Sequence, residues 1–284
     1  MSETPEGDKR CMSDWNIEVI NDYAGRGQFK SALFDFDGTI SLIRQGWQEI
    51  MKPYFFSLLK GTPGAKDETD DALMTCVHEF VDFNTGKQTI YQCISLAEEI
   101  SKRGGKPEDP FAYKDEYHRR LLERIQYRLD GLRNGEIAPE DYVVPGSFEL
   151  LEALVSRGQI MYLASGTDEQ YVLEEAALLG VTGFFDGGIY GARKDYKTFS
   201  KKMIVNRIIS EHGLSGTDLV GFGDGYVEIE NVKSVGGFAV GVASNEETRS
   251  GVDEWKRERL IRAKADIIIP DFKETDKLLG YIFS

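Results

Sequence analysis

Cysteine is scarce in this sequence, with only Cys11, Cys76 and Cys93 among 284 residues. Three widely spaced cysteines do not form a disulfide framework, and their scarcity indicates a reducing compartment. The three histidines show no metal-binding spacing with cysteine or with each other, so a zinc site is not expected.

Long apolar runs and an excess of positive charge are also missing. No run of 18 apolar residues occurs, which argues against a membrane span, and the polar opening MSETPEGDKR does not resemble a signal peptide. We therefore expect a cytoplasmic protein. The net charge of -14 argues against a nucleic-acid partner. An apolar content of 41% and a length of 284 residues are sufficient for a globular protein with a buried core.

The first half of the chain changes character twice. Residues 1–28 form an extension whose start we expect to be disordered, although 15–23 should pack as a helix or a strand. Residues 31–34 are apolar and precede Asp35-Phe36-Asp37-Gly38-Thr39, which predicts a buried strand followed by a turn. From 42 to 143 helical periodicity replaces this pattern and predicts a four-helix insertion. The expected helices cover 45–60, 67–83, 88–103 and 113–131.

Strands and helices alternate in the second half, from residue 144 to 284. We expect strands at 160–164, 184–190, 219–222, 238–242 and 266–270. The intervening helices should cover 147–157, 169–179, 199–212 and 227–234, followed by one charged helix. This alternation predicts an α/β fold, a parallel sheet covered on both faces. The core would consist of 29–41 and 144–284, and the helical insertion of 42–143.

Three polar, glycine-containing turns follow predicted strands. They are Asp35–Thr39, Ser165-Gly166-Thr167 and Gly223-Asp224-Gly225. Because ligands bind at the carboxyl ends of strands in such sheets, we expect these turns to meet at one edge.

The acidic residues of these turns are suited to phosphoryl transfer. A carboxylate such as Asp35 can act as a covalent nucleophile, and Asp37 beside it can serve as general acid and base. Anions crowded around a phosphate require a divalent cation, and Mg²⁺ prefers oxygen ligands. We expect Asp35, Asp37 and Asp224 to hold it. Glu228 lies four residues after Asp224 and is a further ligand candidate if a helix begins at this turn.

A transferred phosphoryl group also needs hydrogen-bond donors. Ser165 offers a hydroxyl, Gly166 an accessible amide at a helix N-terminus, and Thr39 a second hydroxyl. Lys197, with Lys194 as a rival, precedes a predicted helix and can supply an ammonium group.

Simpler interpretations exist for each of these turns. Gly223-Asp224-Gly225 taken alone can be a plain turn or part of a nucleotide-binding glycine loop, although it lacks the G-x-G-x-x-G arrangement. The Asp-x-Asp-Gly pattern also occurs in calcium-binding loops, but position 12 would be Gly46 instead of glutamate, and a strand precedes the motif. Ser165-Gly166-Thr167 can simply cap the helix that follows.

In order and type, the motifs resemble those of the haloacid dehalogenase superfamily. The similarity rests on Asp35–Thr39, then Ser165-Gly166-Thr167, then Lys197, then Gly223-Asp224 with Glu228, and covers about residue 29 to the C-terminus. The resemblance implies a Rossmann-like core, Mg²⁺, an Asp35 nucleophile, an Asp37 acid/base and a helical cap.

One position departs from the family pattern, since Thr198 follows Lys197 where proline is frequent. Asp37 favours phosphoryl transfer within the family, because dehalogenases lack an acid/base at that place. The resemblance also implies that the loop between the second and third cap helices faces the active site. This makes Thr85, Gly86 and Lys87 candidates for substrate binding, and Arg44 lies close to the first motif.

Together these features predict a Mg²⁺-dependent phosphatase for a small phosphate ester, such as a sugar or polyol phosphate. A sugar phosphomutase, which returns the phosphoryl group to another hydroxyl, is the main alternative. A protein that only senses a ligand in the cap pocket is a third possibility.

Overall fold

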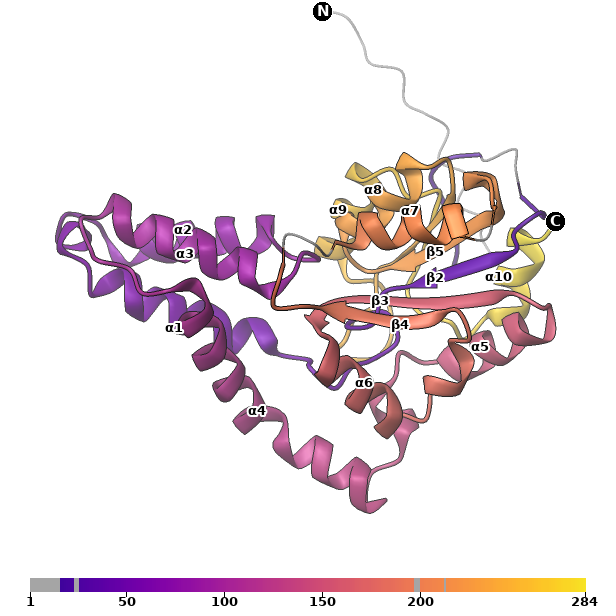
Figure 1. The fold of residues 1–284 in the computed structure, drawn as a ribbon, viewed down its shortest axis with the longest axis horizontal. Helices are drawn as coiled ribbons and strands as arrows, with labels where there is room; N and C mark the ends of the chain where they lie inside the picture. The colour runs from indigo at the N-terminus through magenta and orange to yellow at the C-terminus, as the bar shows by residue number, and fades with distance from the viewer. Residues whose placement is uncertain (1–15, 23–25, 197–199, 212) are drawn as a thin grey trace, which may run out of the picture.

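A twisted β-sheet forms the centre of the molecule (Figure 1). The computed structural model describes residues 16–22, 26–196, 200–211 and 213–284. Within these residues the sheet has seven strands in the order β1-β7-β6-β5-β2-β3-β4. Strands β2 to β7 are parallel, and β1 pairs antiparallel with β7. Their bounds are β1 Glu18–Val19, β2 Ser31–Phe34, β3 Ile160–Asp168, β4 Gly188–Ala192, β5 Leu219–Gly223, β6 Phe238–Val242 and β7 Ile267–Ile269.

Helices cover both faces of this sheet, as the predicted parallel arrangement requires. Helices α7, α8 and α9 lie on one face, and α5, α6 and α10 lie on the other (Figure 1). Because side chains alternate along a strand, Leu33 packs with the first layer and Phe34 with the second. The helices are α5 Ser147–Ser156, α6 Glu169–Leu178, α7 Lys201–Glu211, α8 Tyr226–Ser234, α9 Glu254–Arg262 and α10 Thr275–Ile282.

The insertion after β2 forms a separate group of helices beside the sheet (Figure 1). It contains α1 Trp47–Lys60, α2 Asp70–Phe83, α3 Thr89–Lys102 and α4 Pro110–Asn134. Phe55, Val77, Leu96 and Ile125 are fully buried between them, one from each helix, so the group has its own apolar core. No helix in the described ranges is long and apolar enough to cross a lipid bilayer.

The structure confirms the α/β prediction and differs from it at three elements. The strand expected at 184–190 begins at Gly188, because Thr182–Phe184 form a 3-10 turn. Helix α10 was not predicted, although its Leu278, Leu279 and Ile282 are buried on one side. Residues 18 and 19 form a strand too short to show a periodic pattern.

The rings of Phe34 and Phe222 connect the two central strands. Phe34 ends β2 directly before Asp35, and Phe222 lies opposite it on β5. The rings stack with centroids 4.5 Å apart and are almost fully buried. This pair therefore fixes how the ends of β2 and β5 lie next to each other.

We expect Phe34→Ala to lower the free energy of unfolding by about 3 to 5 kcal/mol, because it leaves a cavity between the strands. The matched control is Phe83→Ala, where the ring is 67% exposed. It should cost less than about 1 kcal/mol. Urea unfolding of both variants measures the difference, and equal losses would contradict this role for Phe34.

Candidate active site

The three predicted turns meet at one edge of the sheet. Phe34 of β2 lies level with Phe222 of β5 and Leu163 of β3. The next positions along these neighbouring strands bring Asp35, Gly223-Asp224 and Ser165 together. The structure thus places the acidic and hydroxyl side chains around one point, as the sequence predicts.

The two carboxylate oxygens of Asp35 have different surroundings. Oδ1 accepts hydrogen bonds from the Phe36 amide at 2.8 Å and from Lys201 Nζ at 2.8 Å. Oδ2 has no hydrogen-bond partner among the described residues, and Asp35 lines a cavity. The pKa of Asp35 is raised to about 7 overall. Burial has the largest effect and raises the pKa, Lys201 lowers it, and the charge of Asp224 raises it. One oxygen is held in place while the other is open to react.

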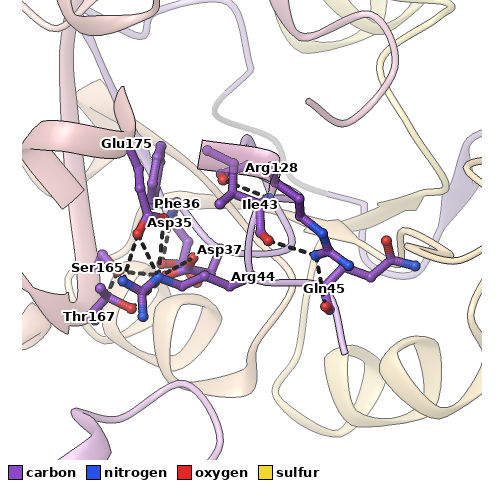
Figure 2. Close-up of polar contacts among 11 residues, drawn as sticks. Asp35, Phe36, Asp37, Ile43, Arg44, Gln45, Arg128, Ser165, Thr167 and Glu175 are labelled. Atoms are coloured by element: carbon purple, nitrogen blue, oxygen red, sulfur yellow. Dashed lines mark hydrogen bonds and ion pairs between the residues drawn. The ribbon is translucent and has the colours of Figure 1, made fainter. Parts of the chain in front are cut away.

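Asp37 is held by two hydroxyl groups (Figure 2). Its Oδ2 accepts hydrogen bonds from Ser165 Oγ at 3.1 Å and from Thr167 Oγ1 at 2.8 Å. Its Oδ1 is buried and has no hydrogen-bond partner within the part of the chain that the structure describes. The Nε atom of Arg44 lies 3.9 Å from Oδ1, which is an ion-pair distance but too long for a hydrogen bond.

Two buried lysines compensate the acidic charge. Lys201 contacts Glu228 as well as Asp35. Lys256 lies 2.8 Å from Asp224 Oδ2 and 2.7 Å from Glu246 Oε1. Burial by itself would lower the pKa of Lys256, but the two carboxylates raise it overall. Each lysine therefore neutralises a pair of acids that would otherwise repel each other.

The turn after β2 packs tightly against Asp224. A Cβ atom on Gly38 would lie 2.2 Å from Asp224 Oδ2, and Gly38 has a φ of +76°. Only glycine fits this approach and this backbone conformation. The hydroxyl of Thr39 accepts a hydrogen bond from the Asp224 amide at 3.0 Å. Thr39, predicted to bind phosphate, is fully buried here and connects the two acidic turns.

The cavity lies between this edge and the helical insertion. From the insertion and its connection it is lined by Arg44, Gln45, Trp47, Met51, Thr85, Gly86, Lys87, Thr89, Gln92 and Tyr117. The predicted loop residues Thr85, Gly86 and Lys87 thus face the acidic turns. A Cβ atom on Gly166 would lie 2.6 Å from the Lys87 carbonyl oxygen, so the two segments are in close contact.

The remaining predicted residues lie outside the described ranges, at the surface, or in contacts that the sequence did not indicate. Lys197 lies outside the described residues, and Lys194 is exposed. Arg44 is bound by Glu175 at 2.6 Å, and Lys87 Nζ donates to Asn84 Oδ1 at 3.1 Å. The predictions that Ser165 caps a helix and that the Gly166 amide lies at a helix N-terminus are both wrong, because β3 continues to Asp168 and that residue precedes α6.

Sequence reasoning missed Lys201, Lys256, Glu175 and Glu246. The first three carry a common signal, since each lies on the buried side of its helix. In α7, for example, Lys201 precedes the buried Ile204, Val205 and Ile208 at helical spacing. A charged residue within an apolar stripe is seldom buried without a partner, so it points to a hidden ion pair.

Within the described ranges, no three acidic, histidine or cysteine side chains are arranged to hold a metal ion as they stand. The chemistry of the donor set nevertheless suits a hard cation such as Mg²⁺. Asp35, Asp37 and Asp224 line one cavity, where the carboxylates of Asp35 and Asp224 and the backbone carbonyl oxygen of Asp37 are oxygen donors of the kind that Mg²⁺ prefers. Repulsion from Asp224 and Asp37 helps to raise the pKa of Asp35, and a cation would relieve it.

The raised pKa of Asp35 predicts a pH-dependent stability in the presence of a chelator. The unfolded chain ionises Asp35 near pH 3.8, whereas the folded protein does so near 7. Between these values the folded state binds more protons, so the contribution of Asp35 to stability is lost as the pH rises. The Asp35→Asn variant does not lose stability in this way, because asparagine does not ionise. We expect the variant to gain stability relative to the wild type from pH 4 to 7, measured by urea unfolding, and a pH-independent difference would contradict it.

Known proteins share this fold. The haloacid dehalogenase-like hydrolase family matches residues 29–236. No curated protein matches the chain. A predicted phosphoglycolate phosphatase from Haemophilus somnus 129PT has 18% identity and a TM-score of 0.58, covering 88% of this chain and 98% of its own. β-Phosphoglucomutase from Clostridium difficile has 17% identity and a TM-score of 0.57, covering 89% and 98%.

A third similar structure is a HAD family hydrolase from Deinococcus radiodurans R1 with bound phosphate and sodium. It has 16% identity and a TM-score of 0.53, covering 90% of this chain and 97% of its own. At these identities the structures share the fold with this chain. The family match spans most of the chain and includes all three turns. The chain therefore belongs to the haloacid dehalogenase-like hydrolase family.

Proposed function

We propose that the protein is a Mg²⁺-dependent phosphatase that hydrolyses a small phosphomonoester through a phosphorylated Asp35. The observation that carries this proposal is the open Oδ2 atom of Asp35. It belongs to a carboxylate whose other oxygen is fixed by Lys201 and the Phe36 amide, next to the hydroxyl-bound Asp37. This arrangement pairs a nucleophile with an acid/base group in one cavity.

The reaction has two steps. Asp35 Oδ2 attacks phosphorus, the bond from phosphorus to the leaving oxygen breaks, and Asp37 donates a proton to that oxygen. Asp37 then takes a proton from a water molecule, whose oxygen attacks the phosphorus of the aspartyl phosphate. The bond from phosphorus to Asp35 Oδ2 breaks, which releases inorganic phosphate and restores the Asp35 carboxylate. Ser165 and Thr167 orient Asp37, and Lys201 holds Asp35. We assign Ser165 and the Gly166 amide to binding the phosphoryl group.

We assign the metal to Asp35, Asp37 and Asp224. When bound, Mg²⁺ supplies charge neutralisation for the phosphate oxygens between these carboxylates. Glu228, a fourth candidate from the sequence, lines a smaller cavity together with Lys201. Its contact with the ammonium group assigns it to holding Lys201 in place.

The helical insertion is proposed to act as a cap over this site. In this division the core consists of 29–41 and 144–284, the cap of 42–143, and residues 1–28 form an N-terminal extension. Besides Arg44 and Lys87, the cap side of the cavity offers neutral polar groups, namely Gln45, Thr85, Thr89, Gln92 and Tyr117. Amides and hydroxyls suit the alcohol groups of a sugar or polyol phosphate, which supports this substrate class.

Asp35→Asn should abolish phosphate release while leaving the fold intact, because an amide is a poor nucleophile. The test is a panel of phosphorylated sugars, polyols and a generic aryl phosphate, assayed for free phosphate with and without Mg²⁺. The exposed Asp130→Asn is the matched control and should remain active. Mass spectrometry of acid-quenched enzyme should find the phosphoryl group on Asp35.

Near-normal hydrolysis by the Asp35→Asn variant would contradict the mechanism. Conservation of phosphate with exchange between hydroxyls would identify a phosphomutase instead. Absence of any phosphoryl transfer would favour a ligand-sensing protein.

A further inference from the structure

A buried ion pair lies directly behind Asp37. Arg44 belongs to the connection between the first acidic turn and α1, and Glu175 lies on α6 (Figure 2). Arg44 Nη2 donates to Glu175 Oε1 at 2.6 Å, and Arg44 Nε donates to both carboxylate oxygens at 3.0 and 3.1 Å. Both side chains are almost completely buried. Arg44, predicted as a substrate-binding residue, thus has its charge already paired.

The same guanidinium group stops short of Asp37. Arg44 Nε lies 3.9 Å from Asp37 Oδ1, and this oxygen has no hydrogen-bond partner although it is buried. A buried carboxylate oxygen without a partner is unusual and calls for an explanation. Here the guanidinium group of Arg44 is a strong donor close to Asp37 Oδ1, but its N–H groups donate to Glu175 instead.

The backbone on both sides of Arg44 is held by hydrogen bonds. A shift of Arg44 from Glu175 to Asp37 would therefore involve its side chain alone. Arg128 of α4 donates to the carbonyl oxygens of Ile43 at 2.7 Å and Gln45 at 2.9 Å (Figure 2). Glu175 is equally restrained, because its neighbours Val172 and Ala176 on α6 are fully buried. The position of the guanidinium group is therefore set by competition between Glu175 and Asp37.

We propose that Glu175 is a positioning residue that holds Arg44 away from Asp37. This keeps Asp37 free to exchange a proton with the leaving oxygen and with water, and it rests on the phosphatase function proposed above. Without Glu175, the buried Arg44 would lose its hydrogen-bonded acid, and Asp37 is the other acid within ion-pair distance of it among the described residues. A guanidinium hydrogen-bonded there would hold the carboxylate of Asp37 from both sides, since Ser165 and Thr167 already bind Oδ2, and it would oppose the protonated form that donates to the leaving oxygen.

The test compares Glu175→Met with the double variant Arg44→Met/Glu175→Met. In the single variant we expect kcat for an alkyl phosphomonoester to fall about 100-fold, within the range of general acid–base catalysis, with little change in KM. The double variant removes the displaced cation as well and should recover most of kcat. Glu174→Met, on the same helix but in an exposed pair with Arg133, is the control and should match the wild type.

A leaving-group comparison separates positioning from general damage. Nitrophenolate leaves without protonation, so rapid-quench formation of the aspartyl phosphate from nitrophenyl phosphate should be nearly normal in Glu175→Met. Formation from an alkyl phosphate should be slow. A merely structural defect would slow both alike and would overturn the proposal. Glu175→Gln, which keeps an acceptor for Arg44, should be intermediate and replaces Glu175→Met if that variant does not fold.

A crystal structure of the single variant gives a readout independent of activity. Arg44 should lie within hydrogen-bond distance of Asp37 Oδ1. A guanidinium group that stays in place, or a double variant no better than the single one, would overturn the inference. Failure of the proposed function is distinguishable, because the wild type would then form no aspartyl phosphate.

Discussion

The ammonium group of Lys201 holds the buried carboxylate of Asp35, and much of the site depends on this contact. Burial opposes the ionised form of Asp35, and the neighbouring acids Asp37 and Asp224 oppose it further. Lys201 counteracts both effects and fixes one oxygen. Through Glu228 it also connects α7 and α8 to the end of β2. A reactive carboxylate can persist in the interior because a cation of opposite charge is buried with it.

The same principle recurs around the cavity. Lys256 lies between Asp224 and Glu246, and Arg44 lies between Glu175 and Asp37. Each buried cation is shared by two acids, so its position depends on which acid binds it more closely. At Lys201 and Lys256 both contacts are direct. At Arg44 only the contact with Glu175 is a direct hydrogen bond. This difference leaves the Oδ1 atom of Asp37 without a hydrogen-bond partner among the described residues.

Polar contacts connect the helical insertion to the core near the cavity. Tyr226 donates to the Phe83 carbonyl oxygen at 2.7 Å, and Arg259 donates to that of Asp82 at 2.7 Å. Both acceptors belong to the end of α2, next to the loop that carries Lys87. Contacts of this kind can be exchanged for water at modest cost, as is common between domains. They would suit the proposed role of the insertion as a cap that admits a substrate and then covers it.

The order of strands and helices could be predicted from the sequence because it depends on local periodicity and on turn residues. Asp35, Asp37, Ser165 and Asp224 were found for the same reason, since each follows an apolar strand. The exceptions are short elements: the two-residue strand β1, in a segment left open as helix or strand, and the eight-residue helix α10, which was missed although its apolar residues follow helical spacing. In both, pairing or packing with distant segments determines the structure.

The sequence by itself therefore determined the fold class, the family and the acidic residues at the edge of the sheet. Only the tertiary structure decided which charges meet. Asp35 and Lys201 are 166 positions apart, and Arg44 and Glu175 are 131 apart. Local pattern cannot select partners over such separations, because the choice depends on which helix faces are buried against the strand ends. That packing turned Lys201 into the partner of Asp35 and Glu175 into the partner of Arg44.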